Sequence, residues 1–99
     1  MLHQKVQLTN KQAKGYVIPL GPVNLVHVVT DMGMVGCGAF DVAALDAFGY
    51  AAARVRATRG ASVANIDDLL VGEVKDANAA AVELGVRVGM SGREALDCM

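Results

Sequence analysis

The N-terminal third of the chain consists of short apolar segments separated by turn-forming residues, and this pattern predicts a β-sheet. Residues 2–9 alternate between apolar and polar side chains, which is typical of a half-exposed strand. Residues 10–15 are polar and end in glycine, so they predict a hairpin connection to a returning strand at 16–20. A Gly-Pro turn at 21–22 follows, and residues 24–30 are apolar on both faces. A strand of that kind lies centrally in a sheet or is covered by a partner.

The remaining residues predict a mixture of strands and short helices. In order, we expect a tight turn at 31–34, a strand ending near Gly38, a helix at 41–48, a strand at 51–58, helices at 66–71 and 76–84, an extended segment at 86–88 and a closing helix from residue 92. Asn65 is a good N-cap, and Ser91 with Glu94 forms a capping box. This order predicts an α+β domain with a mostly antiparallel sheet, an N-terminal β-hairpin and three to four short helices.

Length and composition bear on the assembly of the protein. The 99 residues correspond to a single domain, 1–99, with N-terminal strands at 1–23 and a body at 24–99. Hydrophobic residues make up 54% of the chain and charged residues only 19%. A domain of this size has a modest core, so part of that apolar surface is expected at an interface. We therefore expect a homo-oligomer.

Several classes of partner and cofactor are not expected. A net charge of −1 argues against a dedicated nucleic-acid surface, although it excludes no local patch. The longest apolar stretch, 16–30, is too short and too interrupted to span a bilayer, so no membrane association is expected. Two cysteines without a signal peptide predict reduced thiols and a cytoplasmic location. Because no metal-ligand spacing, dinucleotide fingerprint or Walker motif occurs, we expect no metal and no cofactor.

The best candidate site is the Gly-Cys-Gly segment at 36–38, where a predicted strand passes into a predicted helix. Glycine there allows a sharp turn or the close approach of a neighbouring group. Backbone N–H groups near a helix start can bind an anion or lower the pKa of a thiol. We therefore expect a small anionic ligand to be bound by Gly36, Cys37, Gly38, Asp41 and Arg56.

Arg56 belongs to a basic stripe that also contains Arg54 and Arg59. Arginine binds carboxylate and phosphate well, so the stripe is suited to holding the anion. The alternatives are a solvated strand face or ion pairs with local acids, for which residues 31, 67 and 68 are available. No aromatic residues accompany the arginines, so stacking of a single-stranded nucleic acid on them is not expected.

Cys37 has two further interpretations. The first is a buried structural cysteine in a close-packed site, since free cysteine is among the most buried residue types. The second is a catalytic thiol nucleophile, for which His27 is the obvious base. A two- or four-residue loop at 31–34 places Cys37 opposite Val28 and faces it away from His27, whereas a three-residue loop places it opposite Val29. Because two-residue loops are commoner, a dyad within one chain is disfavoured, and a base from another subunit stays open.

Three blocks of sequence resemble a known family. They are Cys-Gly-Ala-Phe-Asp-Val at 37–42, Asn-Ile-Asp-Asp-Leu-Leu at 65–70 and Leu-Gly-Val-Arg-Val-Gly-Met-Ser-Gly-Arg-Glu-Ala-Leu at 84–96. In this order and spacing they resemble the small prokaryotic family known as domain of unknown function 1805, from about residue 24 to the end. The resemblance implies a compact α/β domain whose N-terminal strands mediate oligomerisation, described as tetramerisation. It implies no activity and no catalytic residues.

Three hypotheses for the function follow. The first is an uncharacterised homo-oligomeric domain that binds a small anionic ligand at the Gly-Cys-Gly junction. The second is a small enzyme with Cys37 as its thiol nucleophile and a base from a neighbouring chain. The third is a regulatory partner of another protein, through the apolar face around Leu25, His27 and Val29.

Overall fold

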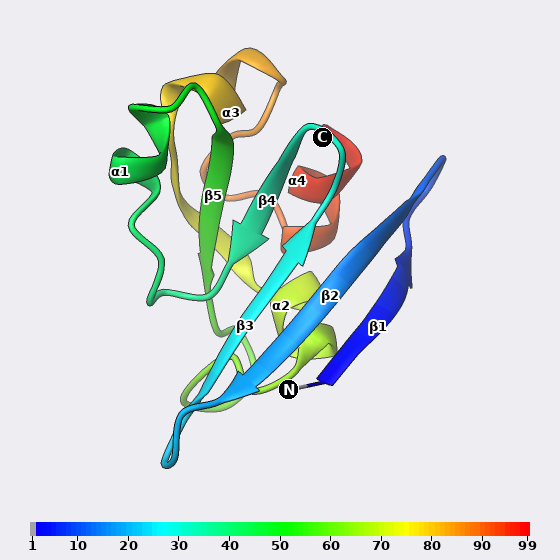
Figure 1. Ribbon diagram of the computed structural model, residues 1–99, viewed down its shortest axis with the longest axis vertical. Coiled ribbons are helices and arrows are strands. Elements are labelled where there is room, and N and C mark those ends of the chain that lie inside the picture. The colour runs from blue at the N-terminus through cyan, green and yellow to red at the C-terminus, as the bar shows by residue number, and fades with distance from the viewer. Residues whose placement is uncertain (1) are drawn as a thin grey trace.

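The computed structural model describes residues 2–99, which form one six-stranded sheet with helices on both sides (Figure 1). The strands lie in chain order, and every neighbouring pair is antiparallel except β4 and β5, which are parallel. The strands are β1 Leu2–Gln7, β2 Gln12–Pro19, β3 Asn24–Val29, β4 Gly33–Gly36, β5 Ala51–Arg56 and β6 Glu73–Ala77; the helices are α1 Val42–Asp46, α2 Ile66–Val71, α3 Ala79–Glu83 and α4 Gly92–Asp97. The predicted α+β class, the antiparallel character and the N-terminal hairpin are confirmed.

The first hairpin has a tighter turn than the sequence predicted. The backbone N–H of Leu8 donates to the carbonyl of Lys11 at 2.8 Å, so β2 begins at Gln12 rather than at residue 16. The expected loop at 10–15 is therefore too long. Ala13 and Gly15 are buried in β2 and face the core, while their neighbours Gln12 and Lys14 are exposed. Because the inward residues are small, the sequence of this half of β2 does not show the usual alternation of large apolar and polar side chains.

The length of the turn between β3 and β4 determines whether Cys37 and His27 lie on the same face of the sheet. The backbone N–H of Thr30 donates to the carbonyl of Gly33 at 2.8 Å, which leaves a two-residue loop. Cys37 then lies opposite Val26, to whose carbonyl its N–H donates at 2.9 Å. The expected partner, Val28, was wrong by two residues. Positions two residues apart share a face of a strand, so the predicted side of the sheet is correct.

The two faces of the sheet are covered differently. On one face α2 and α4 pack over the strands, and the core there contains fully buried Leu69, Leu96, Val28 and Val35 among others. On the other face a smaller cluster of Met34, Val42 and Ala52 lies under α1. That cover is confined to β4 and β5, so no helix within residues 2–99 covers the outward face of β1–β3 (Figure 1).

The sixth strand was missed by the sequence analysis, which expected a helix to begin at Asp76. The helix α3 begins only at Ala79, because the buried Asn78 caps it by accepting from the N–H of Ala81 at 3.0 Å. The same Asn78 oxygen accepts from the N–H of Ala52 at 3.1 Å, which fixes the end of β6 beside β5. The segment at 86–88, expected to be extended, forms no strand. No helix within residues 2–99 has the length and apolar character needed to cross a membrane.

Candidate functional site

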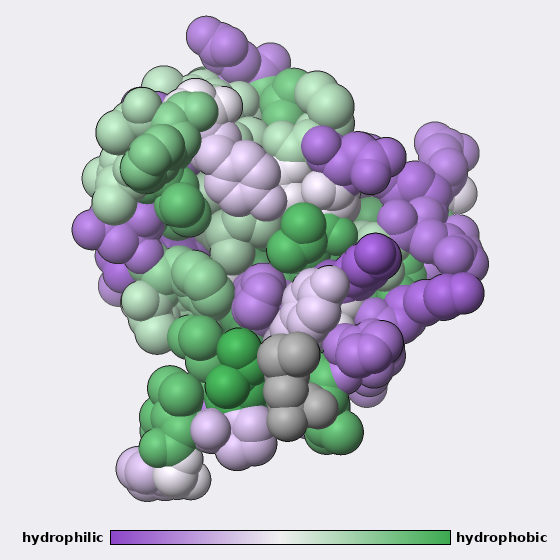
Figure 2. Space-filling model, in the orientation of Figure 1, coloured by the Kyte–Doolittle hydropathy of each residue, from purple (hydrophilic) through white to green (hydrophobic). Residues whose placement is uncertain are grey.

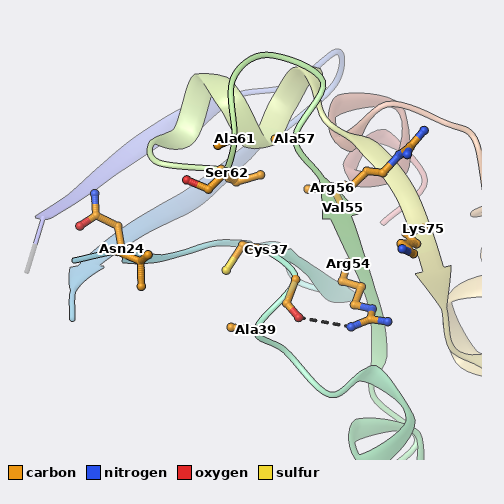
Figure 3. Close-up of a pocket in the computed structure, with 13 residues that line it drawn as sticks. Asn24, Cys37, Ala39, Arg54, Val55, Arg56, Ala57, Ala61, Ser62 and Lys75 are labelled. Carbon is orange, nitrogen blue, oxygen red and sulfur yellow. Dashed lines mark hydrogen bonds between the residues drawn. The ribbon is translucent and has the colours of Figure 1, made fainter. Parts of the chain in front are cut away.

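A hollow of about 380 Å³ opens where the parallel pair β4–β5 comes apart. Strand β4 ends at Gly36, opposite Arg54, while β5 continues beyond that point. The loop at 57–63 closes the hollow on the side away from β4 (Figure 3). The hollow therefore lies at the carboxyl ends of the two parallel strands, where the loops that follow the strands diverge.

The lining of the hollow is cationic on one side and apolar on the other. Arg54, Arg56 and Lys75 contribute the charge, and none of the lining residues among 2–99 is Asp or Glu. The apolar part includes the buried side chains of Val55 and Val63. Positive groups against a wall of low polarity concentrate an electrostatic field, which raises the local concentration of anions.

Two of the three cations are paired with acids outside the hollow. Arg54 forms an ion pair with Asp76 of the adjacent strand, and Arg56 donates through Nε to Oε1 of Glu73 at 2.8 Å. These pairs correct the expected partners among residues 31, 67 and 68, of which only Asp68 is used, by Arg59. Lys75 forms no ion pair within the part of the chain that the structure describes.

Arg54 also holds the junction in place. Its Nη1 donates to the carbonyl oxygen of Gly38 at 3.2 Å (Figure 3). The guanidinium therefore bridges Asp76 and the loop that follows β4. Gly38 and Ala39 separate this hollow from a second one, which is lined by Asp41 and Asp76 together with Arg54. The second hollow contains carboxylates beside its cation, and it is therefore less suited to an anion.

The predicted site residues divide between these places. Cys37, Gly38 and Arg56 line the cationic hollow. Gly36 does not, because it lies beneath the ring of Phe40 on the opposite face of the sheet. Asp41 does not line it either: its carboxylate caps α1 by accepting from the N–H of Ala44 at 3.0 Å.

Two cations of the hollow were not among the predicted ligand-binding residues. Lys75 lies on the strand that the sequence analysis missed, so no pattern placed it near the junction. Arg54 and Arg56 alternate with apolar residues in β5, so they lie on the same face of the strand. This spacing could have predicted that Arg54 belongs to the site together with Arg56. The structure places both beside the Cys37 end of β4.

Cys37 is only 6% exposed and belongs to the main hydrophobic core. His27 lies on the other face of the sheet, stacked on Tyr16 with ring centroids 5.0 Å apart and in edge contact with Phe40 at 5.2 Å. The Nδ1 atom of His27 is buried without a hydrogen-bond partner within residues 2–99, and burial lowers the pKa of this side chain. The structure therefore does not bring Cys37 and His27 together.

The other glycine-rich turn, at 89–94, is occupied by its own internal contacts. The predicted capping box of Ser91 and Glu94 is present. A Cβ atom at Gly92 would overlap the carbonyl oxygen of Leu69, so the glycine lets α4 approach α2 closely. Arg93 reaches back to the first hairpin and donates to the carbonyl of Gln7 at 2.9 Å. This segment thus stabilises the packing of the N-terminal strands on the body.

Comparison with known proteins gives the family. A profile described as a domain of unknown function, DUF1805, matches residues 36–99, which include both glycine-rich turns and all the cations of the hollow. The chain belongs to the DUF1805 family. It is 40% identical over 79 residues to the uncharacterised protein YunC of Bacillus subtilis, covering 80% of this chain and 77% of that protein.

A solved structure extends the comparison to the fold of the DUF1805 chain. The protein of unknown function TA1206 from Thermoplasma acidophilum superposes with a TM-score of 0.81, covering 97% of this chain and 91% of that one. Its sequence identity is 22%, so the likeness concerns the fold alone. The superposition includes the N-terminal strands, which the family profile does not match.

Proposed function

We propose that this protein is a homo-oligomeric domain that binds a small anionic ligand in the hollow at the carboxyl ends of β4 and β5. The observation that carries the proposal is the charge of the lining: in the described part of the chain it contains three cationic side chains and no carboxylate. Lys75 supports it most directly, because its charge is balanced by no ion pair within residues 2–99. Lys75 is exposed, so water solvates its charge, and an anion in the hollow would take the place of that water.

The size and the walls of the hollow narrow the chemistry of the ligand. Small-molecule sites are usually about 300–1,000 Å³ and mostly apolar with a few polar groups, and the hollow, at about 380 Å³, lies at the lower end of that range. The accessible apolar side chains of the lining, Val23, Ala57 and Ala61, offer a surface for a short hydrocarbon group. A carboxylate or phosphate with a short apolar body fits this arrangement better than a bare inorganic ion.

A competing proposal, a thiol enzyme, rests on Cys37 lining the same hollow. A thiolate nucleophile needs a base or cation that activates it and access to the substrate. Cys37 is almost completely buried, and the histidine nearest to it along the strands lies on the opposite face of the sheet. The ligand-binding proposal is therefore favoured, with Cys37 as part of the wall.

Assembly through the N-terminal strands is supported by exposed apolar residues at one end of the sheet. Leu20 and Val23, in the turn between β2 and β3, are 55% and 53% exposed. They adjoin Ile18 and Leu25, which are cross-strand partners and half-buried. Figure 2 shows this end of the molecule as a green apolar area. Apolar clusters of this kind mark interfaces, so the tetramer implied by the family resemblance is proposed to form here.

The assembly proposal is tested by measuring the molar mass of the protein in solution. Light scattering coupled to size-exclusion chromatography is expected to give a multiple of the 10.3 kDa chain, and four chains in the proposed tetramer. Leu20→Glu places a charge in the exposed cluster, outside the cationic hollow, and is expected to shift the mass toward a single chain. A single-chain mass for the unaltered protein contradicts the proposal.

The ligand proposal is tested with three probes. Isovalerate carries both an apolar body and a carboxylate, isoamyl alcohol carries only the body, and inorganic phosphate carries only charge. We expect isovalerate to shift the amide NMR resonances of Gly38 and Lys75 at the lowest concentration. Lys75→Gln is expected to weaken that binding about tenfold, which corresponds to about 1.4 kcal/mol.

Arg59→Gln is the matched control, because Arg59 belongs to the same basic stripe but pairs with Asp68 and does not line the hollow. It is expected to change the affinity for isovalerate by less than about twofold. Equal losses in Arg59→Gln and Lys75→Gln would show that only the general charge of the protein is sensed. Binding of none of the probes at about 10 mM would contradict the proposal.

A further inference from the structure

Charge is distributed very unevenly along this chain. Residues 1–30 contain three lysines, no arginine and no acid, whereas residues 31–99 contain the other six basic residues and all ten acids. The first three strands therefore carry a net charge of +3 and the rest of the chain −4. Such asymmetry indicates a surface for an anionic partner that the overall charge of −1 conceals.

The outward face of β1–β3 arranges two of these lysines beside aromatic rings. Lys5 and Lys14 are direct cross-strand partners, and the next outward pair along the same two strands is His3 and Tyr16. Inward positions of the same strands pack on α2, as Gly15 shows by its contact with Ile66, so these four side chains belong to the other face. In Figure 2 the area over β1 and β2, on the right of the view, is mostly purple, that is, hydrophilic.

The two lysines are an unfavourable pair as they stand. Like charges directly opposite each other in an antiparallel pair destabilise the sheet, with Cβ atoms only about 4.5–5.5 Å apart. Neither Lys5 nor Lys14 forms an ion pair within residues 2–99. An anion bound between the two ammonium groups removes this repulsion.

The rings next to the lysines form a short stack of His27, Tyr16 and His3, and its outer end, His3, is exposed. The ring of Tyr16 is stacked on His27 on its inner side, with an interplanar angle of 20°. On its outer side lies His3, whose ring is tilted by 39° with its centroid 6.1 Å away. A base stacked between two rings needs their centroids about 7 Å apart, so a base on the outer side of Tyr16 has to displace the His3 ring. His3 is exposed on the edge strand, and we expect its side chain to rotate away.

A shallow hollow of about 180 Å³ joins the two pairs, and its lining includes both lysines, His3 and Tyr16. We propose that this hollow binds a nucleoside phosphate, either free or as a unit of a single strand, with its base against Tyr16 and its phosphate between Lys5 and Lys14. A sugar phosphate would use the lysines but leave the ring surface unused. The site lies apart from the cationic hollow beside Cys37 and shares no lining residue with it.

The proposal is tested by NMR titration with adenosine monophosphate. The protein contains only two tyrosines and no tryptophan, so the ring resonances of Tyr16 can be followed individually. Stacking of the base is expected to move them upfield, with ribose 5-phosphate and adenosine each binding at least about fivefold more weakly. A hexanucleotide that binds about tenfold more tightly than the monophosphate identifies a single strand as the ligand, and equal affinities identify the free nucleotide.

Matched variants separate a built site from general charge. Lys14→Gln is expected to weaken binding about fivefold or more, and Tyr16→Leu to abolish the preference for the monophosphate over ribose 5-phosphate. Lys11→Gln removes the same charge from the turn of the same hairpin, outside the hollow, and is expected to have less than about a twofold effect. Lys75→Gln should also leave binding unchanged.

The salt dependence adds an independent measure. Two lysine–phosphate contacts predict a slope of log affinity against log salt of about −1.4 for a single strand, which Lys14→Gln reduces to about −0.7. Equal losses in Lys11→Gln and Lys14→Gln would overturn the proposal. So would the absence of any shift of the Tyr16 ring at about 10 mM adenosine monophosphate.

Discussion

Two glycine-rich turns precede helices in this protein, and they have opposite characters. In the turn at 36–41 one glycine is packed and the other is free: Gly36 supports the ring of Phe40, while a Cβ at Gly38 would meet nothing within 4 Å. In the turn at 89–94 the helix start is fully used by a capping box, and Gly92 is pressed against α2. The first turn borders a cationic hollow and the second fastens the body together.

This difference shows that a glycine-rich turn in a sequence predicts a tight turn or close packing of the backbone, but does not predict whether the turn borders a ligand site. Both turns offered helix N-termini in the sequence. In both, however, a side chain of the turn already occupies the helix start, Asp41 at α1 and Ser91 at α4. The property that distinguishes the first turn is supplied by its neighbours Arg54, Arg56 and Lys75 rather than by the glycines.

The largest expected effect on stability comes from adding one methyl group at the packed glycine of each turn, Gly92 and Gly36. Gly92→Ala forces a Cβ into the carbonyl oxygen of Leu69, which is backbone and cannot move without shifting α2. We expect the free energy of unfolding in urea to fall by about 3 kcal/mol or more. Gly36→Ala displaces the ring of Phe40, which has rotamer freedom, and is expected to cost about 1–2 kcal/mol.

Gly38→Ala is the control for this series, since its Cβ points into open space and its backbone φ is not in the left-handed region. It is expected to change the free energy of unfolding by less than about 0.5 kcal/mol. A Gly38→Ala variant as unstable as Gly92→Ala would remove the distinction between the two turns.

A smaller effect is expected in the reactivity of the two cysteines. Cys37 belongs to the first turn and is buried, whereas Cys98 ends the helix that the second turn begins and is partly exposed. With one cysteine present at a time, in Cys98→Ser and Cys37→Ser, iodoacetamide near neutral pH is expected to modify Cys98 about tenfold faster, because access limits the buried thiol. Faster alkylation of Cys37 would instead favour the thiol enzyme.

Much of the fold could be predicted because its signals are local. The hairpin, the capping residue Asn65 and the capping box at 91–94 are each encoded within a few residues, and all are present. The side of the sheet on which Cys37 lies was also predicted correctly. The predicted partner of Cys37 was two residues off, yet the predicted face was correct, since a shift of two residues preserves the face.

The elements that were missed depend on contacts between distant segments. The strand at 73–77 has only Val74 as a buried side chain. It forms an antiparallel pair with β5, and ion pairs link the side chains of the two strands, which no local pattern reveals. Lys75 enters the hollow only because this strand exists. The site was therefore predicted in part. The sequence analysis identified Cys37, Gly38 and Arg56, but it did not name Arg54 or Lys75 as ligand-binding residues.

The smallest expected effect concerns the packed side of the first turn and its dependence on pH. His27 contacts Phe40, which rests on Gly36, and burial holds the pKa of His27 below its ordinary value of 6.5. As the pH falls through 6.5, the unfolded chain takes up this proton before the folded protein does, so folding stability decreases. The decrease is complete once the pH lies below the pKa of the folded state.

We therefore expect the urea midpoint of the unaltered protein to fall between about pH 7.5 and about pH 5.5 by more than that of His27→Phe, which keeps an aromatic ring but cannot titrate. The variant also removes the buried nitrogen that has no partner, so it is expected to be at least as stable at the lower pH. The turn at 89–94 contains no histidine, and His3 is common to both proteins. An equal pH dependence in the two proteins would place the relevant proton elsewhere and disconnect His27 from the packing of the first turn.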